Sequence, residues 1–197
     1  MKKRCEWPLV GGGQTGGSDL MLKYHDTEWG VPQHNDKILF EFLLLDSFQA
    51  GLSWSTILNK RQNFKKAFDN FSVKKIAKYD KKKLAQLMGD AGIIRNRLKI
   101  EGAVKNAKAF LQIQKEFESF NKYVWQFVGG KPKKNKWKTM RQIPAISKEA
   151  ETLNKNLKAR GFTFVGPTII YAFMQGAGLV NDHTIYCFRY NQVSKLK

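Results

Sequence analysis

The amino-acid sequence predicts an all-α fold, in which helices follow one another along most of the chain. Apolar residues recur at helical spacing, residues typical of helix N-caps precede several apolar stretches, and no strand-rich alternation is present. The 197 residues, 42% of them hydrophobic, suffice for the core of one compact domain spanning residues 1–197. Such a domain can comprise two helical lobes, with a hairpin near 87–97.

Three helices are predicted in the first half of the chain, each with a candidate capping residue. The caps and helices are Asp36 for 38–45, Ser72 for 73–79 and Asp80 for 81–88. The side chains of such residues accept hydrogen bonds from first-turn N–H groups, so they mark where each helix begins.

The second half contains the longer predicted helices. They are an amphipathic helix within 95–117, a helix from Ser147 to a stop at Gly161, and a buried helix at 165–179. Pro167 suits the first turn of the last one, because an N–H group in that turn has no partner within the helix. The loop between Gly129 and Pro144 is predicted to be mobile or to join the lobes.

The turn at 87–97 places glycines between two amphipathic helices, and Gly92 lies at its centre. Backbone N–H groups at such a turn can bind phosphate, and the cationic residues Arg95, Arg97 and Lys99 lie beside it. The segment resembles a helix-hairpin-helix DNA-binding motif. An ordinary interhelical turn can also contain glycine, so the segment alone does not decide between the two.

The charge balance favours a nucleic-acid partner. There are 35 Lys and Arg residues against 16 Asp and Glu, a formal net charge of +19, which attracts phosphate backbones. The run at 131–138 (KPKKNKWK) fits this reading and also an ordinary solvated face. No stretch is long and apolar enough for a membrane span, and no signal peptide is evident, so we expect a cytoplasmic protein.

The two cysteines, Cys5 and Cys187, each have a histidine nearby in sequence, His25 and His183. Two thiolates and two imidazoles are the ligand set of a closed, structural zinc site. His183 and Cys187 are four residues apart and would share one face of a helix if that segment were helical. Two buried thiols with unrelated histidines, or a Cys5–Cys187 disulfide, are the alternatives. His34 is expected at the surface.

Six segments together resemble the 3-methyladenine DNA glycosylase I family, over nearly the whole chain. In chain order they are residues 4–7 (RCEW), 24–32 (YHDTEWGVP), 49–54 (QAGLSW), 90–95 (DAGIIR), 160–166 (RGFTFVG) and 179–183 (LVNDH). The resemblance implies a bacterial helix-hairpin-helix glycosylase that excises 3-methyladenine from alkylated double-stranded DNA. It also implies a structural zinc held by Cys5, His25, His183 and Cys187. A monomer is the default expectation.

The resemblance also implies roles at the base site. Trp54 stacks on the flipped base, and Trp7 and Trp29 help to form the pocket. Asp46 and Tyr24 recognise the base, while Gly51 and Leu52 lie where the duplex is wedged open. Ordinary core packing is the alternative for each tryptophan.

The chain departs from the family pattern at the base site. Asp46 stands where the family usually has the longer Glu, Ser47 where Gly is familiar, and Met21 where Tyr is common. A glycine-rich insertion at 11–17 precedes them. These departures bear on substrate binding more than on reaction class.

The reaction is expected to be monofunctional hydrolysis. No Asp occurs between Ala91 and Asn181 to stabilise a developing sugar cation, and no lysine stands out as a nucleophile. Alkylation at N3 already makes adenine a good leaving group, so base flipping and binding can supply much of the catalysis. A non-catalytic, zinc-stapled DNA-binding module and a metal-dependent nuclease are the other function classes that remain open.

Overall fold

The computed structural model describes residues 2–10 and 18–196, and these residues are mostly helical. The glycine-rich insertion at 11–17 lies outside them. The α-helices are α1 (Trp7–Val10), α2 (Asp19–Thr27), α3 (Asp36–Gln49), α4 (Trp54–Ala67), α5 (Val73–Ile76), α6 (Lys81–Gly89), α7 (Arg97–Phe117), α8 (Phe120–Trp125), α9 (Lys148–Ala159), α10 (Pro167–Gly176) and α11 (Phe188–Val193). Short 3₁₀ turns are η1 (Asp69–Phe71), η2 (Gln126–Val128) and η3 (Met140–Gln142), and the strands are β1 (Lys133–Lys134) and β2 (Val180–Asn181).

The predicted helical architecture is confirmed for these residues, with one small addition. β1 and β2 pair in parallel, Lys133 opposite Val180 and Lys134 opposite Asn181. The loop predicted at 129–144 therefore carries a strand and a 3₁₀ turn, and it is hydrogen-bonded to the chain just after α10.

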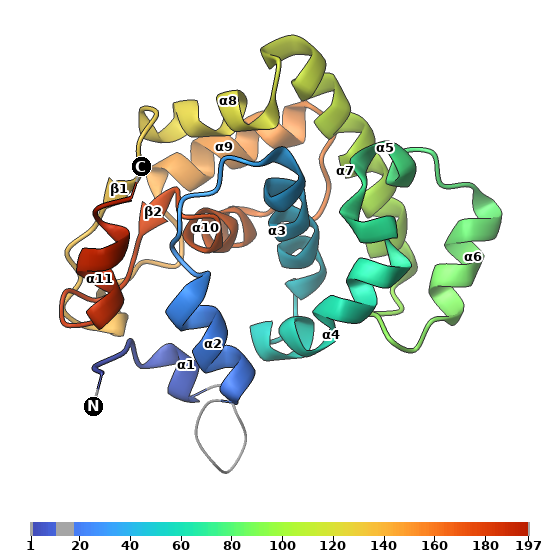
Figure 1. Cartoon of the computed structure of the whole chain (residues 1–197). Helices are drawn as coiled ribbons and strands as arrows, with labels where there is room; N and C mark the ends of the chain where they lie inside the picture. The colour runs from blue at the N-terminus through green and yellow to red at the C-terminus, as the bar shows by residue number, and fades with distance from the viewer. Residues whose placement is uncertain (1, 11–17, 197) are drawn as a thin grey trace.

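The central helix α10 packs against both α3 and α9. Figure 1 shows α8 and α9 above this centre, α1 and α2 below it, α11 on the left and α5 and α6 on the right. The long helix α7 connects the right-hand helices to α8 at the top. No helix among the described residues is long and apolar enough to cross a membrane.

Aromatic rings hold α3 against its neighbours. Phe40 meets Phe110 of α7 edge to face at 5.1 Å, and Phe110 stacks on Phe120 of α8 at 4.1 Å. On the other side of α3, Phe48 meets Phe64 of α4 at 4.9 Å. All five side chains are buried, each contributing roughly 1.5–3 kcal/mol of hydrophobic stabilisation. This packing fixes the helix that carries Asp46.

The cap predicted for α3 is wrong by one residue. Asn35, not Asp36, is the N-cap, and its side chain accepts hydrogen bonds from the N–H groups of Lys37 and Ile38. The Asp36 carboxylate instead accepts from the backbone of Phe120 and Asn121 at 2.8 Å each. Asp36 therefore joins the start of α3 to the start of α8.

Two of the remaining predicted caps are confirmed, since Asp80 and Ser147 cap α6 and α9 through their side chains. Ser72 precedes α5 but its side chain makes no capping hydrogen bond, and α5 ends at Ile76, earlier than predicted. α7 begins at Arg97, within the predicted range, with Asn96 as its cap, and Gly161 follows α9 with a φ of +88°.

The two ends of the chain meet beside α11. The N–H of Phe188 donates to the carbonyl of Lys3 at 2.9 Å, so the N-terminal segment runs against the start of the last helix. The segment from His183 to Cys187 is a turn and not the helix considered above, and Cys187 itself is the N-cap of α11.

Candidate active site and metal centre

A cavity of about 380 Å³ lies between α1, α2, α3, the start of α4, α10 and the segment after η3. Aromatic side chains form much of its lining, which includes Trp7, Tyr24, Trp29, Trp54 and Tyr171. A predominantly apolar pocket with few polar groups is typical of a small-molecule site. The structure thus brings together the three tryptophans, Tyr24 and Asp46 that were singled out from the sequence.

Asp46 is the charged group of this pocket. It comes from the last turns of α3, is 3% exposed, and its Oδ2 has no hydrogen-bond partner among the described residues. Burial raises the pKa of Asp46 well above its usual value. A buried carboxyl without a partner favours a ligand that brings positive charge and N–H donors.

The Tyr24 hydroxyl is buried beside the same carboxyl. Burial, with a contribution from the charge of Asp46, raises the pKa of Tyr24 well above its usual value, so the phenol stays neutral. Its ring lies 5.2 Å from that of Trp54, and Trp7 meets both Tyr24 and Trp29 edge to face. Flat aromatic walls of this kind suit a planar heterocycle.

Two tryptophan N–H groups add unused donors to the site. Nε1 of Trp7 and Nε1 of Trp54 are buried and have no acceptor among the described residues. Buried polar groups usually find partners, so a ligand with acceptor atoms would satisfy them.

The turn between α3 and α4 borders the pocket and is exposed. Gly51 adopts a φ of +78°, with no described atom within 4 Å of its Cβ position, and Leu52 is 40% exposed. Ser53 then caps α4 through a hydrogen bond from the N–H of Thr56. The structure therefore presents an apolar side chain at the tip of a short turn beside the cavity.

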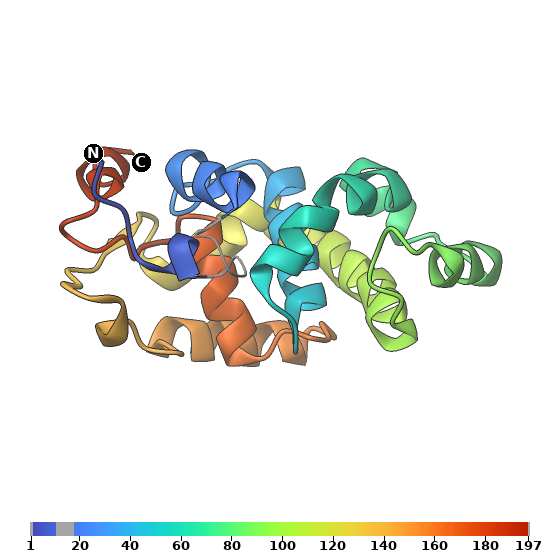
Figure 2. The same cartoon turned by 90° about the horizontal axis from the view of Figure 1, so that it is seen from below.

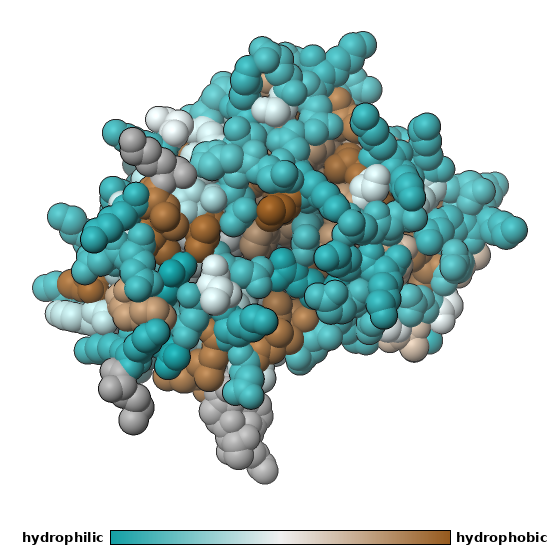
Figure 3. Space-filling model, in the orientation of Figure 1, coloured by the Kyte–Doolittle hydropathy of each residue, from teal (hydrophilic) through white to brown (hydrophobic). Residues whose placement is uncertain are grey.

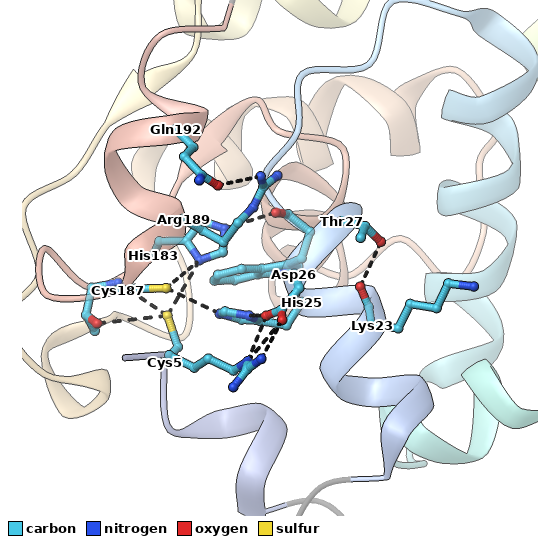
Figure 4. Close-up of polar contacts among 12 residues, drawn as sticks. Cys5, Lys23, His25, Asp26, Thr27, His183, Cys187, Arg189 and Gln192 are labelled. Atoms are coloured by element: carbon cyan, nitrogen blue, oxygen red, sulfur yellow. Dashed lines mark hydrogen bonds and ion pairs between the residues drawn. The ribbon is translucent and has the colours of Figure 1, made fainter. Parts of the chain in front are cut away.

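The two cysteines and their histidine partners converge, as predicted. The four possible ligand atoms all lie within 4.8 Å of one another, and all four residues are buried. Figure 4 shows both sulfurs and both imidazoles pointing toward a common centre. The cysteines are not joined by a disulfide.

The spacing of the cluster fits a tetrahedral zinc. The Nδ1 atom of His183 lies 3.6 Å from Sγ of Cys5 and 3.5 Å from Sγ of Cys187, and Nε2 of His25 lies 3.6 Å from Sγ of Cys187. Zinc bonds of about 2.3 Å to sulfur and 2.0 Å to nitrogen, at tetrahedral angles, separate S and N ligands by roughly 3.5 Å.

The second nitrogen of each histidine is also oriented for this role. Nδ1 of His25 lies 2.8 Å from the Asp26 carboxylate, and Nε2 of His183 lies 3.0 Å from the carbonyl of Trp29. Each of these nitrogens donates its proton to oxygen, which leaves the other nitrogen bare toward the thiols. Arg4 in turn holds Asp26 with bonds of 2.8–3.0 Å. The chemistry of the donor set fits zinc.

The Cys/His cluster and the pocket share a wall. Trp29 lines the pocket and accepts the His183 hydrogen bond with its carbonyl. Asp182, next to His183, is 1% exposed and accepts from Tyr171 at 2.6 Å and from Gln175 at 2.8 Å. Both donors line the pocket, so the chain beside the Cys/His cluster positions pocket side chains.

The hairpin residues lie apart from the pocket, at the start of α7. The N–H of Gly92 donates to Oδ1 of Asp90, and the carbonyls of Ala91 and Gly92 accept from Lys60 of α4. Arg95 and Arg97 are exposed there, Arg97 pairing with Glu101 one turn on.

Lys99 does not have the position expected for a phosphate contact. It is 7% exposed, and its ammonium donates to the carbonyls of Phe48 at 2.8 Å and Ala50 at 2.5 Å. These carbonyls end α3, where a cation is favourable. The prediction placed Lys99 correctly beside the hairpin, but its side chain is directed inward.

Several pocket residues were not predicted from the sequence. Tyr171 and Gln175 reach the pocket from α10, and Met140 and Ile143 from the segment around η3. The one available signal was Asp182, an acidic residue directly before a proposed metal ligand. Periodicity marks α10 as buried but does not say which of its side chains meets a cavity.

The chain is similar to known proteins over nearly its whole length. A family model described as methyladenine glycosylase matches residues 14–190. DNA-3-methyladenine glycosylase 1 of Escherichia coli (strain K12) is 43% identical over 188 residues, which is 95% of this chain and 97% of that protein.

Two solved structures agree with this match. A crystal structure of 3-methyladenine DNA glycosylase I has a TM-score of 0.88 at 42% identity and covers 94% of this chain and 98% of its own. A Tyr-to-Phe variant of 3-methyladenine DNA glycosylase I, in complex with 3-methyladenine, has a TM-score of 0.87 at 34% identity, with coverage of 93% and 96%. The chain belongs to the methyladenine glycosylase family.

Proposed function

We propose that this protein is a DNA-repair enzyme that hydrolyses the N-glycosidic bond of 3-methyladenine in alkylated double-stranded DNA. The observation that carries the proposal is the unpartnered, buried carboxyl of Asp46 inside an aromatic pocket. Family membership and the complex of a relative with 3-methyladenine support it.

Base flipping brings the lesion to this pocket, since a base stacked inside a duplex is out of reach. Trp54 stacks on the flipped base, and Trp7 and Trp29 complete the walls. Leu52, beside Gly51 at the exposed turn, occupies the space that the base leaves. Gly92, Arg95 and Arg97 of the hairpin bind the phosphate backbone, as a helix-hairpin-helix motif does.

Asp46 and Tyr24 act on the base itself. N3-methylation makes the base cationic, and a cation beside Asp46 favours the ionised carboxylate that burial otherwise disfavours. Ordinary adenine offers no such charge, so the carboxylate discriminates between them.

Bond cleavage needs no proton from the enzyme. When the bond from the base to C1′ breaks, its electron pair passes to the cationic base, which leaves as neutral 3-methyladenine. Water adds to C1′ and loses a proton, which gives an abasic sugar. The proposed enzyme is therefore monofunctional, without lyase activity, and Asp46 serves recognition more than acid catalysis.

The metal proposed for Cys5, His25, His183 and Cys187 is zinc in a structural role. When bound, it supplies four-coordinate cross-linking of the chain ends and leaves no open position for water. We propose a monomeric cytoplasmic enzyme formed by one domain, which acts on DNA without a partner subunit.

The experiment is chromatographic. Purified protein is incubated with DNA treated with dimethyl sulfate, and we expect released 3-methyladenine together with unbroken strands at the resulting abasic sites. DNA binding without base release would instead indicate a non-catalytic module. Strand cleavage that requires Mg²⁺ would indicate a nuclease.

A further inference from the structure

The proposed function assigns no role to the basic residues within 131–148. Between Glu118 and Glu149 the sequence contains no acidic residue, and seven Lys or Arg residues lie within 131–148. Four of them, Lys136, Lys138, Arg141 and Lys148, flank the segment around η3; together they are called the basic rim.

The side chains of the basic rim are available to a partner. All four residues are exposed, and among the described residues none of them forms an ion pair. By contrast, Lys133, which precedes them in the same segment, is paired with Glu149. The rim therefore presents positive charge that nothing in the described part of the chain neutralises.

The backbone that carries the rim is anchored on both sides of Lys136. Asn135 donates to Oδ1 of Asp182 at 2.6 Å and Trp137 donates to the same atom at 2.7 Å. The N–H of Ile185 donates to the carbonyl of Trp137, and β1 pairs with β2 just before. A cationic surface on a fixed backbone loses less conformational entropy when it binds.

The rim is continuous with the pocket. Met140 lines the cavity and lies between Lys138 and Arg141 in the chain, and Ile143, Pro144 and Ala145 line it between Arg141 and Lys148. A strand whose flipped nucleotide enters this cavity must bring its neighbouring phosphates close to the cavity mouth.

The rim and the hairpin lie at opposite ends of one elongated side of the molecule. Figure 2 shows the gold segment around η3 on the left, the teal start of α4 in the centre, and the light-green turn before α7 on the right. Figure 3 shows hydrophilic side chains over most of the α5–α7 end. A duplex that touches the hairpin and the α3–α4 turn therefore extends toward the rim.

We propose that the basic rim is a second DNA-contacting surface, which binds backbone phosphates on the side of the pocket away from the hairpin. This inference rests on the proposed function, because it takes the cavity to be where the flipped base lies. Each rim contact releases counterions from DNA, and so contributes to affinity in a salt-dependent way.

The test compares two double variants of equal charge. The rim variant is Lys138→Gln with Arg141→Gln. The control variant is Lys108→Gln with Lys115→Gln, exposed residues in the second half of α7 that form no ion pair among the described residues. This half of α7 runs toward α8 at the top of Figure 1, opposite α1, α2 and the start of α4. The probe is a duplex oligonucleotide with a tetrahydrofuran abasic analogue, and affinity is measured by fluorescence anisotropy over a series of KCl concentrations.

A plot of log affinity against log salt concentration has a negative slope. We expect this slope to be shallower by about 1 to 2 in the rim variant, at roughly 0.9 per lost phosphate contact, and to be unchanged in the control. Trimming the duplex on one side of the analogue, but not on the other, should abolish the difference between rim variant and wild type. Binding of free 3-methyladenine should be equal in all three proteins, which shows an intact pocket.

Equal slopes for the rim and control variants would overturn the inference. So would a rim defect that persists whichever side of the duplex is trimmed. Neither result would touch the proposed function, which fails separately if wild-type protein releases no 3-methyladenine.

Discussion

Asp46 is enclosed by the pocket walls, and no described residue offers its Oδ2 a hydrogen bond. Because burial raises its pKa, the folded protein binds a proton at Asp46 more tightly than the unfolded chain does. Protonation therefore favours the folded state, and ionisation of Asp46 lowers stability as the pH rises through the folded-state pKa.

Asp46→Asn should consequently stabilise the protein at high pH while it impairs excision. We expect a gain of about 0.5–2 kcal/mol in the free energy of unfolding at pH 9, the usual range for a stabilising substitution. The gain should shrink as the pH falls and vanish below about pH 4, the ordinary pKa of Asp in an unfolded chain, because the carboxyl is then neutral in both states. Urea unfolding at several pH values measures this difference, and a variant less stable at pH 9 would contradict the reading of Asp46.

Lys99, by contrast, is expected to stabilise the folded protein, because its buried ammonium has two hydrogen-bond acceptors. Lys99→Met removes the donor for the carbonyls of Phe48 and Ala50 and should cost about 1–3 kcal/mol. The matched control is Arg97→Met, two residues earlier and exposed, which should change stability by less than about 0.5 kcal/mol. Equal effects in thermal unfolding would show that Lys99 is not a structural cap.

The sequence alone predicts the chemical roles of these residues better than it predicts which way their side chains point. Asp46 and Trp54 were named as site residues and lie in the pocket, whereas Lys99 was expected to face DNA. Both faces of α7 carry lysines, so composition cannot tell which one turns toward the end of α3. That choice depends on two carbonyls about fifty residues away in sequence.

At the scale of elements, the turn after α10 makes a close backbone contact with the link between α2 and α3. Gly178 has a φ of +73°, and a Cβ there would lie 2.3 Å from the carbonyl carbon of Val31 and 2.4 Å from the nitrogen of Pro32. This close approach packs the start of β2 against the link between α2 and α3.

Gly178→Ala should therefore destabilise the protein by about 2–5 kcal/mol, the sum of left-handed strain and overpacking. Gly161→Ala is the control, because Gly161 has a φ of +88° but no neighbouring atom of the described residues within 4 Å of its Cβ position. It should cost only about 1–2 kcal/mol. Similar melting temperatures for the two variants would mean that the contact with Val31 and Pro32 is relieved by local movement.

Helix positions were predictable where capping chemistry and periodicity agree. Asp80 and Ser147 cap the helices expected of them. The α3 cap was misplaced because Asn35 and Asp36 are adjacent and both are good caps, and only the contact of Asp36 with α8 distinguishes them. The segment 183–187 was open to a helical reading, but the turn there has the same effect of bringing His183 and Cys187 together.

At the scale of the whole molecule, the cluster of Cys5, His25, His183 and Cys187 joins segments from both ends of the chain. Zinc bound there would stabilise the folded state, because the unfolded chain does not present the four residues together. Chelation should lower the melting temperature by about 10 °C, which corresponds to about 3–5 kcal/mol at 2–4 °C per kcal/mol.

Metal content provides a second readout of this site. Native mass spectrometry should find one zinc per wild-type chain and none after Cys187→Ser. His34→Gln is the control, because His34 is exposed and lies outside the cluster, where it stacks on Trp125. Loss of zinc from the His34 variant, or retention by the Cys187 variant, would contradict the assignment of ligands.

The overall fold could be predicted from the sequence more completely than the set of residues that line the pocket. Family motifs spread over the chain predicted the fold and the convergence of the chain ends. The contributions of Met140 and Tyr171 to the pocket were not predictable. They depend on how the η3 segment and α10 come together through Asp182, and on long-range hydrogen bonds that no local pattern encodes.

The most direct test of the central claim is the rate at which 3-methyladenine is released from dimethyl-sulfate-treated DNA by wild-type protein and by Asp46→Asn, measured beside their affinity for the free base. The account predicts rapid release by the wild type, with release and base affinity both sharply reduced in a variant that remains folded and binds DNA. Undiminished release and binding by Asp46→Asn would show that the buried carboxyl is not the group that recognises the base.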